Sequence, residues 1–410
     1  MGAAWDVMGN GKTSIRVNLG KYLQGANNQQ NYTISNPAMD GRNGRIGPNF
    51  QTTVNRTWTD SNGNFLPDCS LMNPAANGEC GPWSSSGFGS TAGETIIDPA
   101  VLSGWGVRPS DWQFGIGVQQ QILPRTSVEV TYNRRWFNNF FVFKNTLLNP
   151  SDFTAQTIVA PLNPSLPGGG GNAMTYDVLN PGVPTNILDT YTSANNYGGE
   201  KIYWHGVDVT ITSRLHNGFT FQGGTSTGRG VTDFCALAAN MPEIYNPALT
   251  NAANILASTA YQPTSSCHVA ENWLTQFRGL ASYQIPKIDV LFAATLQSAP
   301  NASTGPTDTT VGTNGTSLTA NYTPTPAATF NLVQPGTFYG PRVNLVNLRA
   351  AKVLNLGRYK ATAGVDLFNL FNANTGLAFN QNYGATGVGY LQPTSIQTPR
   401  FVRLNITVNF

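Results

Sequence analysis

Charged residues are scarce in this chain. Lys, Arg, Asp and Glu account for 10% of the 410 residues, whereas about 25% is usual in soluble domains. The formal net charge is only +3, which is too small to indicate nucleic acid as a partner. A composition this poor in charge suits a surface that contacts something other than water.

Long hydrophobic runs are absent as well. No stretch of about 18 apolar residues occurs, so the sequence contains no transmembrane helix. The first residues, MGAAWDVMGNGK, have neither the charged nor the apolar region of a secretory signal peptide. We therefore expect either a cytosolic chain or one whose upstream residues are missing. Two all-β classes fit the composition, a transmembrane β-barrel and a secreted soluble protein.

Cysteine and histidine are rare. The four cysteines fall into two local pairs, Cys69 with Cys80 and Cys235 with Cys267, in loop sequence rich in Pro, Asn and Ser. Two short-range disulfides in an oxidising compartment are one interpretation, and four unrelated thiols are the other. No C-x-x-C pair is present, which argues against zinc. The three histidines have no Ser or Asp partners at triad spacing, so we expect no enzymatic activity.

Alternation of apolar and polar residues is the clearest pattern that is present. In the final segment, TPRFVRLNITVNF, every second residue from Val402 to Phe410 is apolar, and the residues between them are polar. Successive side chains of a strand point to opposite faces, so this segment predicts a strand with one apolar and one polar face. A half-buried soluble strand shows the same alternation, and the rest of the chain must distinguish the two.

Similar segments recur as hairpins. We expect about eleven strands, at residues 3–8, 13–22, 111–122, 126–136, 201–215, 219–229, 272–285, 288–297, 343–354, 359–371 and 402–410. Very short turns alternate strictly with long polar loops, at about 23–109, 142–199, 232–271, 299–340 and 372–396. Outer-membrane barrels have short periplasmic turns and long extracellular loops. A soluble sandwich lacks this asymmetry. The expected fold class is therefore all-β, an antiparallel transmembrane β-barrel portion.

In such a barrel the apolar face contacts lipid and the polar face encloses water. We expect the following polar-face residues to face the lumen, as wall residues that pair or are solvated: Arg16, Asp208, Arg278, Arg349, Asp366 and Arg403. The first and last strands both run toward the short turns. An odd number of antiparallel strands does not close a single-chain barrel, so we expect the chain to be part of a larger one.

One loop segment has the spacing of a cation site. Asp60, Asn62, Asn64 and Asp68 follow the pattern D-x-N-x-N-x₃-D, and oxygen ligands two residues apart can converge on calcium. However, Gly63 stands at position four rather than six, and no Glu follows at position twelve. The alternative is an Asx-rich turn that hydrogen-bonds its own backbone. Calcium is the one cofactor for which the sequence offers a candidate site.

Several segments resemble a known family. AGVDLFNLFNANT (363–375), a loop and QTPRFVRLNITVNF (397–410) resemble the C-terminal end of TonB-dependent outer-membrane receptors. RTWTDSNGNFLPDC (56–69), NRRWFNNF (133–140) and GVDVTITSRLHNGFTFQGGTSTGR (206–229) are similar to the large Oar-like receptors, which carry a carboxypeptidase-regulatory-like domain before the plug. The resemblance extends over essentially the whole chain.

The resemblance implies a barrel of about 22 strands that is filled by an N-terminal plug and coupled to a TonB-type protein of the inner membrane. Residues 1–410 would be its C-terminal part, without plug or signal sequence. The residues that look like the signal for the barrel-assembly machinery are Leu404, Ile406, Val408 and Phe410. The implied partners are outer-membrane lipid, that machinery, the N-terminal barrel half with its plug, and the TonB-type protein.

Three functions remain open at this point. The first is transport, in which the long loops capture a large substrate for uptake across the cell outer membrane. The second is a surface adhesin or structural barrel through which nothing passes. The third is a secreted β-protein that binds glycans. Retention in the membrane fraction separates the third function from the first two.

Overall fold

The computed structural model describes residues 1–24, 54–84, 96–102, 104–185, 188–215, 217–249, 259–301, 317–325, 328–356 and 359–409. Nearly all regular structure in these residues is β. A 12-stranded antiparallel sheet forms the body of the molecule, and smaller sheets lie in its long connections. Within the described ranges, no helix has the length and the apolar character needed to cross a membrane.

The main sheet follows the chain order without crossovers. In spatial order its strands are β1 (Gly2–Asp6), β2 (Thr13–Leu23), β6 (Ser110–Leu123), β7 (Thr126–Asn138), β12 (Lys201–Arg214), β13 (Phe219–Asp233), β15 (Leu274–Ile285), β16 (Val290–Asn301), β19 (Gly340–Leu356), β20 (Tyr359–Phe368) and β24 (Phe401–Asn409). The short β14 (His268–Ala270) pairs with β13 off this path. The all-β antiparallel fold expected from the sequence is confirmed, and the path contains the expected number of strands.

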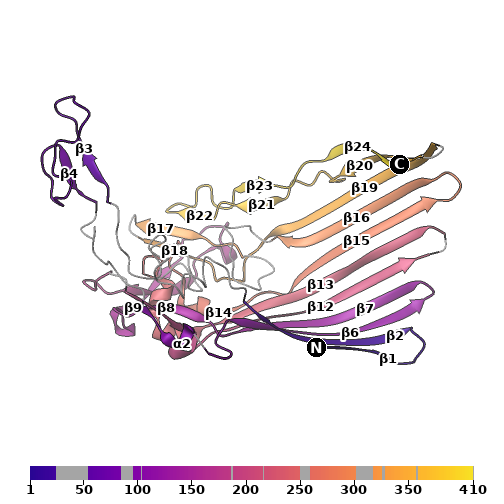
Figure 1. The fold of residues 1–410 in the computed structure, drawn as a ribbon, viewed down its shortest axis with the longest axis horizontal. Coiled ribbons are helices and arrows are strands. Elements are labelled where there is room, and N and C mark those ends of the chain that lie inside the picture. Colours follow the sequence, from indigo (N-terminus) through magenta and orange to yellow (C-terminus); the bar gives the residue numbers. More distant parts are fainter. Residues whose placement is uncertain are drawn as a thin grey trace.

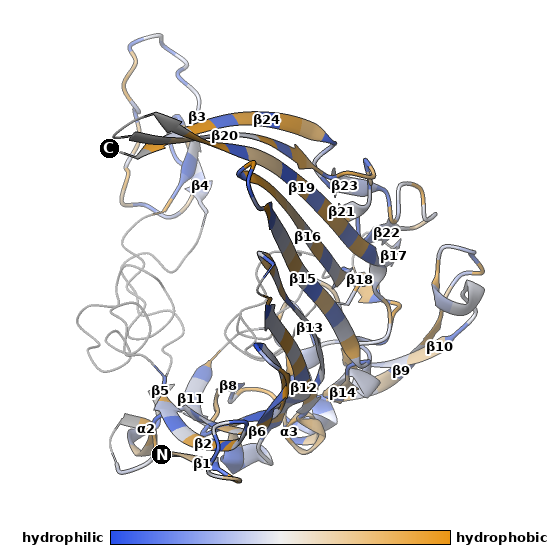
Figure 2. Ribbon diagram, turned by 90° about the vertical axis from the view of Figure 1, so that its right-hand side faces the viewer, coloured by the Kyte–Doolittle hydropathy of each residue, from blue (hydrophilic) through white to orange (hydrophobic). Residues whose placement is uncertain are grey.

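The strands lie along the long axis of the molecule, with the tight turns at one end and the long connections at the other (Figure 1). We call these the short-turn end and the long-loop end. Viewed from the short-turn end, the sheet bends into an open arc with β1 and β24 at its two edges (Figure 2). In the described residues β1 pairs with β2 and β24 pairs with β20, and neither has a second neighbour.

The short turns depend on residues with positive φ. Gly9 and Gly11 have φ values of 65° and 70° between β1 and β2, and the N–H of Gly11 donates to the Asp6 carboxylate at 2.7 Å. Arg125 between β6 and β7 has φ 63°, and Lys287 between β15 and β16 has φ 74°. These turns reverse the chain within a few residues, which fixes the register of each hairpin.

Several strand ends differ from the sequence expectation, and three of them have a clear cause. β13 continues to Asp233, beyond the last alternating residues, because its backbone still pairs with Lys201 of β12. β16 reaches Asn301 through a bulge after Ala299. β20 ends at Phe368 rather than at 371, because Asn369 has φ 49° and interrupts the extended backbone. Backbone pairing and local φ angles set these ends, and side-chain alternation does not report either.

The long connections contain further elements. They are β3 (Arg56–Trp58), β4 (Cys80–Trp83), β5 (Ile96–Ile97), α2 (Pro99–Leu102), β8 (Phe141–Asn145), β9 (Phe153–Val159), β10 (Ala173–Leu179), β11 (Asp189–Ser193), α3 (Cys235–Asn240), β17 (Asn321–Thr325), β18 (Ala328–Asn331), β21 (Gly376–Phe379), β22 (Asn382–Gly384) and β23 (Pro393–Ile396). Short 3-10 helices lie at Pro150–Asp152, Pro167–Gly169, Ala194–Tyr197, Pro242–Tyr245 and Thr264–Cys267.

These connections pack into two buried apolar clusters. The first contains Val142, Ala194, Phe234, Leu237, Ala238, Met241, Ile244 and Tyr245. The second contains Ala160, Leu166, Ala320, Leu332, Val333, Tyr383 and Tyr390. We call the described parts of 141–199, 234–273, 317–338 and 376–396 the loop cap. The polar composition of these segments did not predict this order, which arises from contacts between loops that are distant in sequence.

Candidate functional site

The two faces of the main sheet differ sharply in chemistry. On one face the register places Ile15, Val118, Val130 and Val209 side by side on β2, β6, β7 and β12. The adjacent residues of the same strands lie on the other face, and they are Arg16, Gly117, Thr131 and Asp208. The apolar side chains are not covered by protein, since Leu404 and Ile406 of β24 are 77% and 74% exposed. An apolar face of this extent requires an apolar environment.

Aromatic and cationic side chains meet on the apolar face at its long-loop end. The rings of Trp112 and Trp136 stack with centroids 6.3 Å apart. Lys21 lies 5.7 Å from the Trp112 ring centroid, and the guanidinium of Arg134 lies 5.1 Å from that of Tyr203. Tryptophan, tyrosine and cations of this kind are enriched where a membrane meets water.

The six residues that the sequence assigned to the lumen all lie on the polar face by register. Three of them form one network. The Asp366 side chain is only 6% exposed and pairs with Arg349 at 3.2 Å and with Arg403 at 2.9 Å. The amide of Asn405 donates to the same Asp366 carboxylate at 2.9 Å.

The other three of the six lie apart from that network. Arg16 pairs with Glu129 of β7 at 3.2 Å, and Asp208 accepts a hydrogen bond from Asn133 at 2.6 Å. Arg278 lies opposite Gly224 and Gln297. Glu129 is not among the residues that the sequence pattern singled out, although it occupies a polar position in the alternation of its strand. The wall thus carries separate charged clusters, and their position facing a lumen stays a prediction.

The C-terminal strand places Leu404, Ile406 and Val408 on the exposed apolar face. Phe410 lies outside the described residues. The role of these residues as a signal for barrel assembly stays a prediction.

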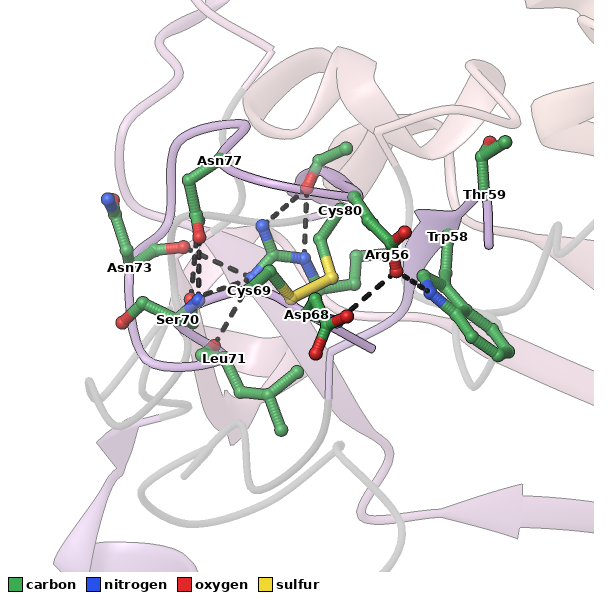
Figure 3. The surroundings of a disulfide bond; sticks show 12 residues. Arg56, Trp58, Thr59, Asp68, Cys69, Ser70, Leu71, Asn73, Asn77 and Cys80 are labelled. Carbon is green, nitrogen blue, oxygen red and sulfur yellow. Dashed lines mark hydrogen bonds between the residues drawn. A yellow bond between two sulfur atoms is a disulfide. The ribbon is translucent and has the colours of Figure 1, made fainter. Parts of the chain in front are cut away.

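The structure joins Cys69 to Cys80 and Cys235 to Cys267, which confirms the first of the two interpretations. The first disulfide lies in the segment 54–84, which we call the disulfide module (Figure 3). At its centre, Arg56 donates to the carbonyl oxygen of Gly81 at 2.6 and 2.9 Å. The same guanidinium also donates to the carbonyl oxygens of Ser70, Leu71, Asn73 and Ala75. A single cation therefore organises the backbone of the module.

The four candidate calcium residues lie together in this module, but their polar atoms bond one another and the backbone. The Asp60 carboxylate accepts from the N–H groups of Gly63 and Phe65 at 2.7 and 3.0 Å. The amides of Asn62 and Asn64 both donate to Asp68. This is the geometry of the Asx-rich turn. The described residues contain no group of three His, Cys, Asp or Glu arranged for a metal, and calcium stays a prediction.

An ion pair is buried within the loop cap. The ammonium of Lys144 lies 2.7 Å from the carboxylate of Glu243, and their side chains are 8% and 1% exposed. Lys144 also donates to the Leu148 carbonyl at 2.8 Å. Burial raises the pKa of Glu243, and Lys144 opposes that rise. Paired and hydrogen-bonded groups of this kind fix the relative position of two loops.

Loops that are distant in the sequence also meet in the cap. The buried Tyr176 hydroxyl of β10 donates to the carbonyl of Asn331 on β18 at 2.8 Å. Burial raises the pKa of that hydroxyl well above its usual range, so it remains a donor. The cap therefore presents an ordered surface at the long-loop end.

No protein-family model matches the sequence, and no curated protein sequence matches it. Among solved structures, the chain is similar to the outer membrane transporter YddB of Escherichia coli, with 9% identity and a TM-score of 0.44 over 99% of this chain and 39% of that one. It is also similar to the ferripyoverdine receptor of the outer membrane of Pseudomonas aeruginosa, with 12% identity and a TM-score of 0.43 over 99% and 32% of the two chains. A structure of the FpvAI–pyocin S2 complex aligns with 11% identity, a TM-score of 0.43 and coverage of 99% and 32%.

These solved structures are outer-membrane transporters and receptors. The chain spans 32–39% of the length of these three solved structures.

Proposed function

We propose that this sheet is part of the wall of a β-barrel in the cell outer membrane. The observation that carries the proposal is the uncovered apolar face opposite a polar face with charged networks. A soluble protein would bury the apolar face against a second layer. In a barrel the apolar face contacts lipid, and the polar face lines a water-filled interior.

The edges of the sheet support a larger barrel. β1 and β24 both run toward the short-turn end (Figure 1). An antiparallel barrel that contains this sheet therefore needs an odd number of further strands between β24 and β1. We propose that the N-terminal half of a TonB-dependent receptor barrel supplies them, and that its plug fills the interior and is coupled to a TonB-type protein. Within the TonB-dependent receptors we propose the Oar-like subfamily, on the basis of the sequence motifs alone.

The function proposed is uptake of a large substrate through this barrel, with the loop cap as the outer vestibule. The ordered packing of the cap supports capture of a ligand, because a surface fixed by a buried ion pair and two apolar clusters loses little entropy on binding. No residue of the chain is proposed to do covalent chemistry. The substrate class proposed is an oligosaccharide or a peptide.

Two measurements test these proposals in sequence. First, cells that express the full-length protein are fractionated, and we expect the protein in the outer membrane, released only by detergent. Recovery in a soluble fraction would contradict the barrel. Second, uptake of labelled oligosaccharides and peptides is compared in wild-type cells, cells lacking the gene and cells lacking the TonB-type protein. We expect both deletions to abolish uptake of the same compound. Cell adhesion lost with uptake intact would favour the adhesin instead.

A further inference from the structure

Two adjoining hollows mark the apolar face between β13 and β20. One of about 410 Å³ is lined by Phe219, Ala281, Tyr283, Phe292, Ala294, Leu348, Ala350 and Val365, among others. The other, of about 390 Å³, is lined by Phe221, Gly223, Phe277, Gly279, Ala281, Ala294, Leu296 and Val346, among others. Because Ala281 and Ala294 line both, the hollows form one continuous groove. β15, β16 and β19, which carry most of it, lie side by side (Figure 2).

Along β15 and β16, small residues form the floor of the groove and larger ones lie at its ends. Ala281 of β15 lies opposite Ala294 of β16. One row toward the short turns, Tyr283 lies opposite Phe292. The floor is open at Gly279, where an added Cβ would meet no atom within 4 Å. The groove therefore has a floor of small residues that is bounded along β15 by the rings of Tyr283 and Phe277.

The length of the groove along the membrane normal matches the thickness of one membrane leaflet. Its rows extend from Tyr283 to Phe277, which is roughly 20 Å along a strand at about 3.4 Å per residue. Strands of outer-membrane barrels tilt by about 35–45°, so the groove covers roughly 15 Å along the membrane normal. This is about half of the ~30 Å hydrocarbon core of a bilayer.

A cation stands at the short-turn end of the groove. Lys352 of β19 lies opposite Val290, one row beyond Phe292 and on the same face. Its ammonium donates to the carbonyl of Ile288, which occupies one of its three N–H donors. Within the described residues Lys352 forms no ion pair. Lys287 and Asp289 belong to the adjoining turn.

We propose that this groove is a phospholipid site. One acyl chain lies along Tyr283, Ala281 and Gly279, and the phosphate of the same lipid bonds Lys352 at the short-turn, periplasmic side. The apolar lining, the leaflet-deep length and the Lys352 ammonium at the short-turn end together match a lipid anchored by its headgroup. At the other end Arg342 lies 5.4 Å from the Phe277 ring centroid and already donates to the carbonyl oxygens of Thr275 and Ser298. This inference rests on the proposed function, because only a barrel in a membrane brings lipid to this face.

The test is native mass spectrometry of the full-length protein, purified from outer membranes in a mild detergent, with phosphatidylglycerol as the added probe. We expect the wild-type protein to retain one phospholipid. The double variant Gly279→Leu with Ala281→Leu fills the groove from an open floor and should lower retention at least about tenfold. The matched control is Val118→Phe, which adds bulk to the same face outside the groove and should retain lipid as the wild type does.

A second pair of variants tests the headgroup contact. Lys352→Met should weaken retention of phosphatidylglycerol, and Lys352→Arg should restore it. Lys21→Met removes a lysine from the same face at the long-loop end and should change nothing. Equal retention by the wild type and the groove-filling variant, with both recovered from outer membranes, would overturn the lipid site and leave the barrel standing. Failure of the wild type to enter the membrane would instead overturn the proposed function.

Discussion

Arg403 of β24 donates to the Asp366 carboxylate of β20 at 2.9 Å, on the opposite face of the sheet from its neighbour Leu404. Within two residues the last strand thus moves from a cation that pairs with a buried carboxylate to an apolar side chain that is 77% exposed. In a soluble protein this arrangement is inverted, since charges lie outside and leucine inside. Arg403 and Leu404 therefore illustrate why we assign lipid to one face of the sheet and water to the other.

The first prediction concerns the apolar face of β24. Leu404→Arg should destabilise the protein in lipid by about 2–4 kcal/mol, because a cation on the lipid face near the bilayer midplane loses its hydration. Thr407→Arg, on the polar face of the same strand, is the matched control and should cost less than about 1 kcal/mol. Urea unfolding of the protein reconstituted in lipid measures both. Similar costs for the two variants would contradict the assignment of the faces.

The second prediction concerns Asp366. Asp366→Leu leaves Arg349 and Arg403 close together without their shared carboxylate. Both guanidinium groups are partly solvated, so we expect a loss of only about 1–3 kcal/mol. Asp208→Leu, which breaks a hydrogen bond to Asn133 with no arginine pair, should cost less. The same unfolding experiment ranks the two variants, and the reverse order would show that the network contributes nothing.

The sheet could be predicted from the sequence, and the loop cap could not. Period-2 alternation reports which face each side chain takes, so Arg403 and Leu404 were placed correctly on opposite faces of the sheet. The cap depends on contacts such as that of Tyr176 with Asn331, which are 155 residues apart. No local pattern encodes such a contact. Strand ends were missed where a positive φ, as at Asn369, stops the extended backbone.

The candidate sites show the same division. Local cysteine pairs predicted the disulfides, because a loop of 11 residues brings Cys69 and Cys80 together readily. The sequence spacing predicted that the Asx residues of the disulfide module lie close together. It did not predict that the Asn62 and Asn64 amides donate to Asp68. The direction of an amide depends on its surroundings in three dimensions.

The third prediction concerns the buried ion pair of the cap. Glu243→Gln removes the carboxylate and leaves the Lys144 ammonium without its partner in a buried site. We expect the cap to lose about 3–5 kcal/mol of local stability. The double variant Lys144→Met with Glu243→Leu removes both charges and should recover most of it. Hydrogen exchange of the amides around Ile244 measures the loss, and equal protection in all three proteins would contradict a structural role for the pair.

The fourth prediction concerns the first disulfide. Cys69→Ser with Cys80→Ser opens a cross-link with a sequence separation of 11, which should cost the disulfide module about 2–3 kcal/mol by the chain-entropy estimate. The Arg56 contacts with the backbone carbonyls of the module should then be broken more often, so protease sites near Phe65 become accessible. Limited proteolysis followed by mass spectrometry detects this. Cys235→Ser with Cys267→Ser is the control and should leave cleavage near Phe65 unchanged.

The fifth prediction concerns pH. Burial raises the pKa of Glu200, which lies immediately before β12, from 4.5 to about 7. A carboxyl whose folded pKa exceeds its unfolded value stabilises the fold fully below the unfolded pKa, and this contribution is lost as pH rises through the folded pKa. The local stability around Glu200 should therefore fall between pH 4.5 and about 7, by on the order of 2 kcal/mol after allowance for partial solvation. The stability of the Glu200→Gln variant should not change with pH over that interval, and the variant should be more stable than the wild type at pH 8. Hydrogen exchange of the Tyr197–Tyr203 amides across this range measures the effect, and a pH profile of the variant that follows the wild type would assign the dependence to another group.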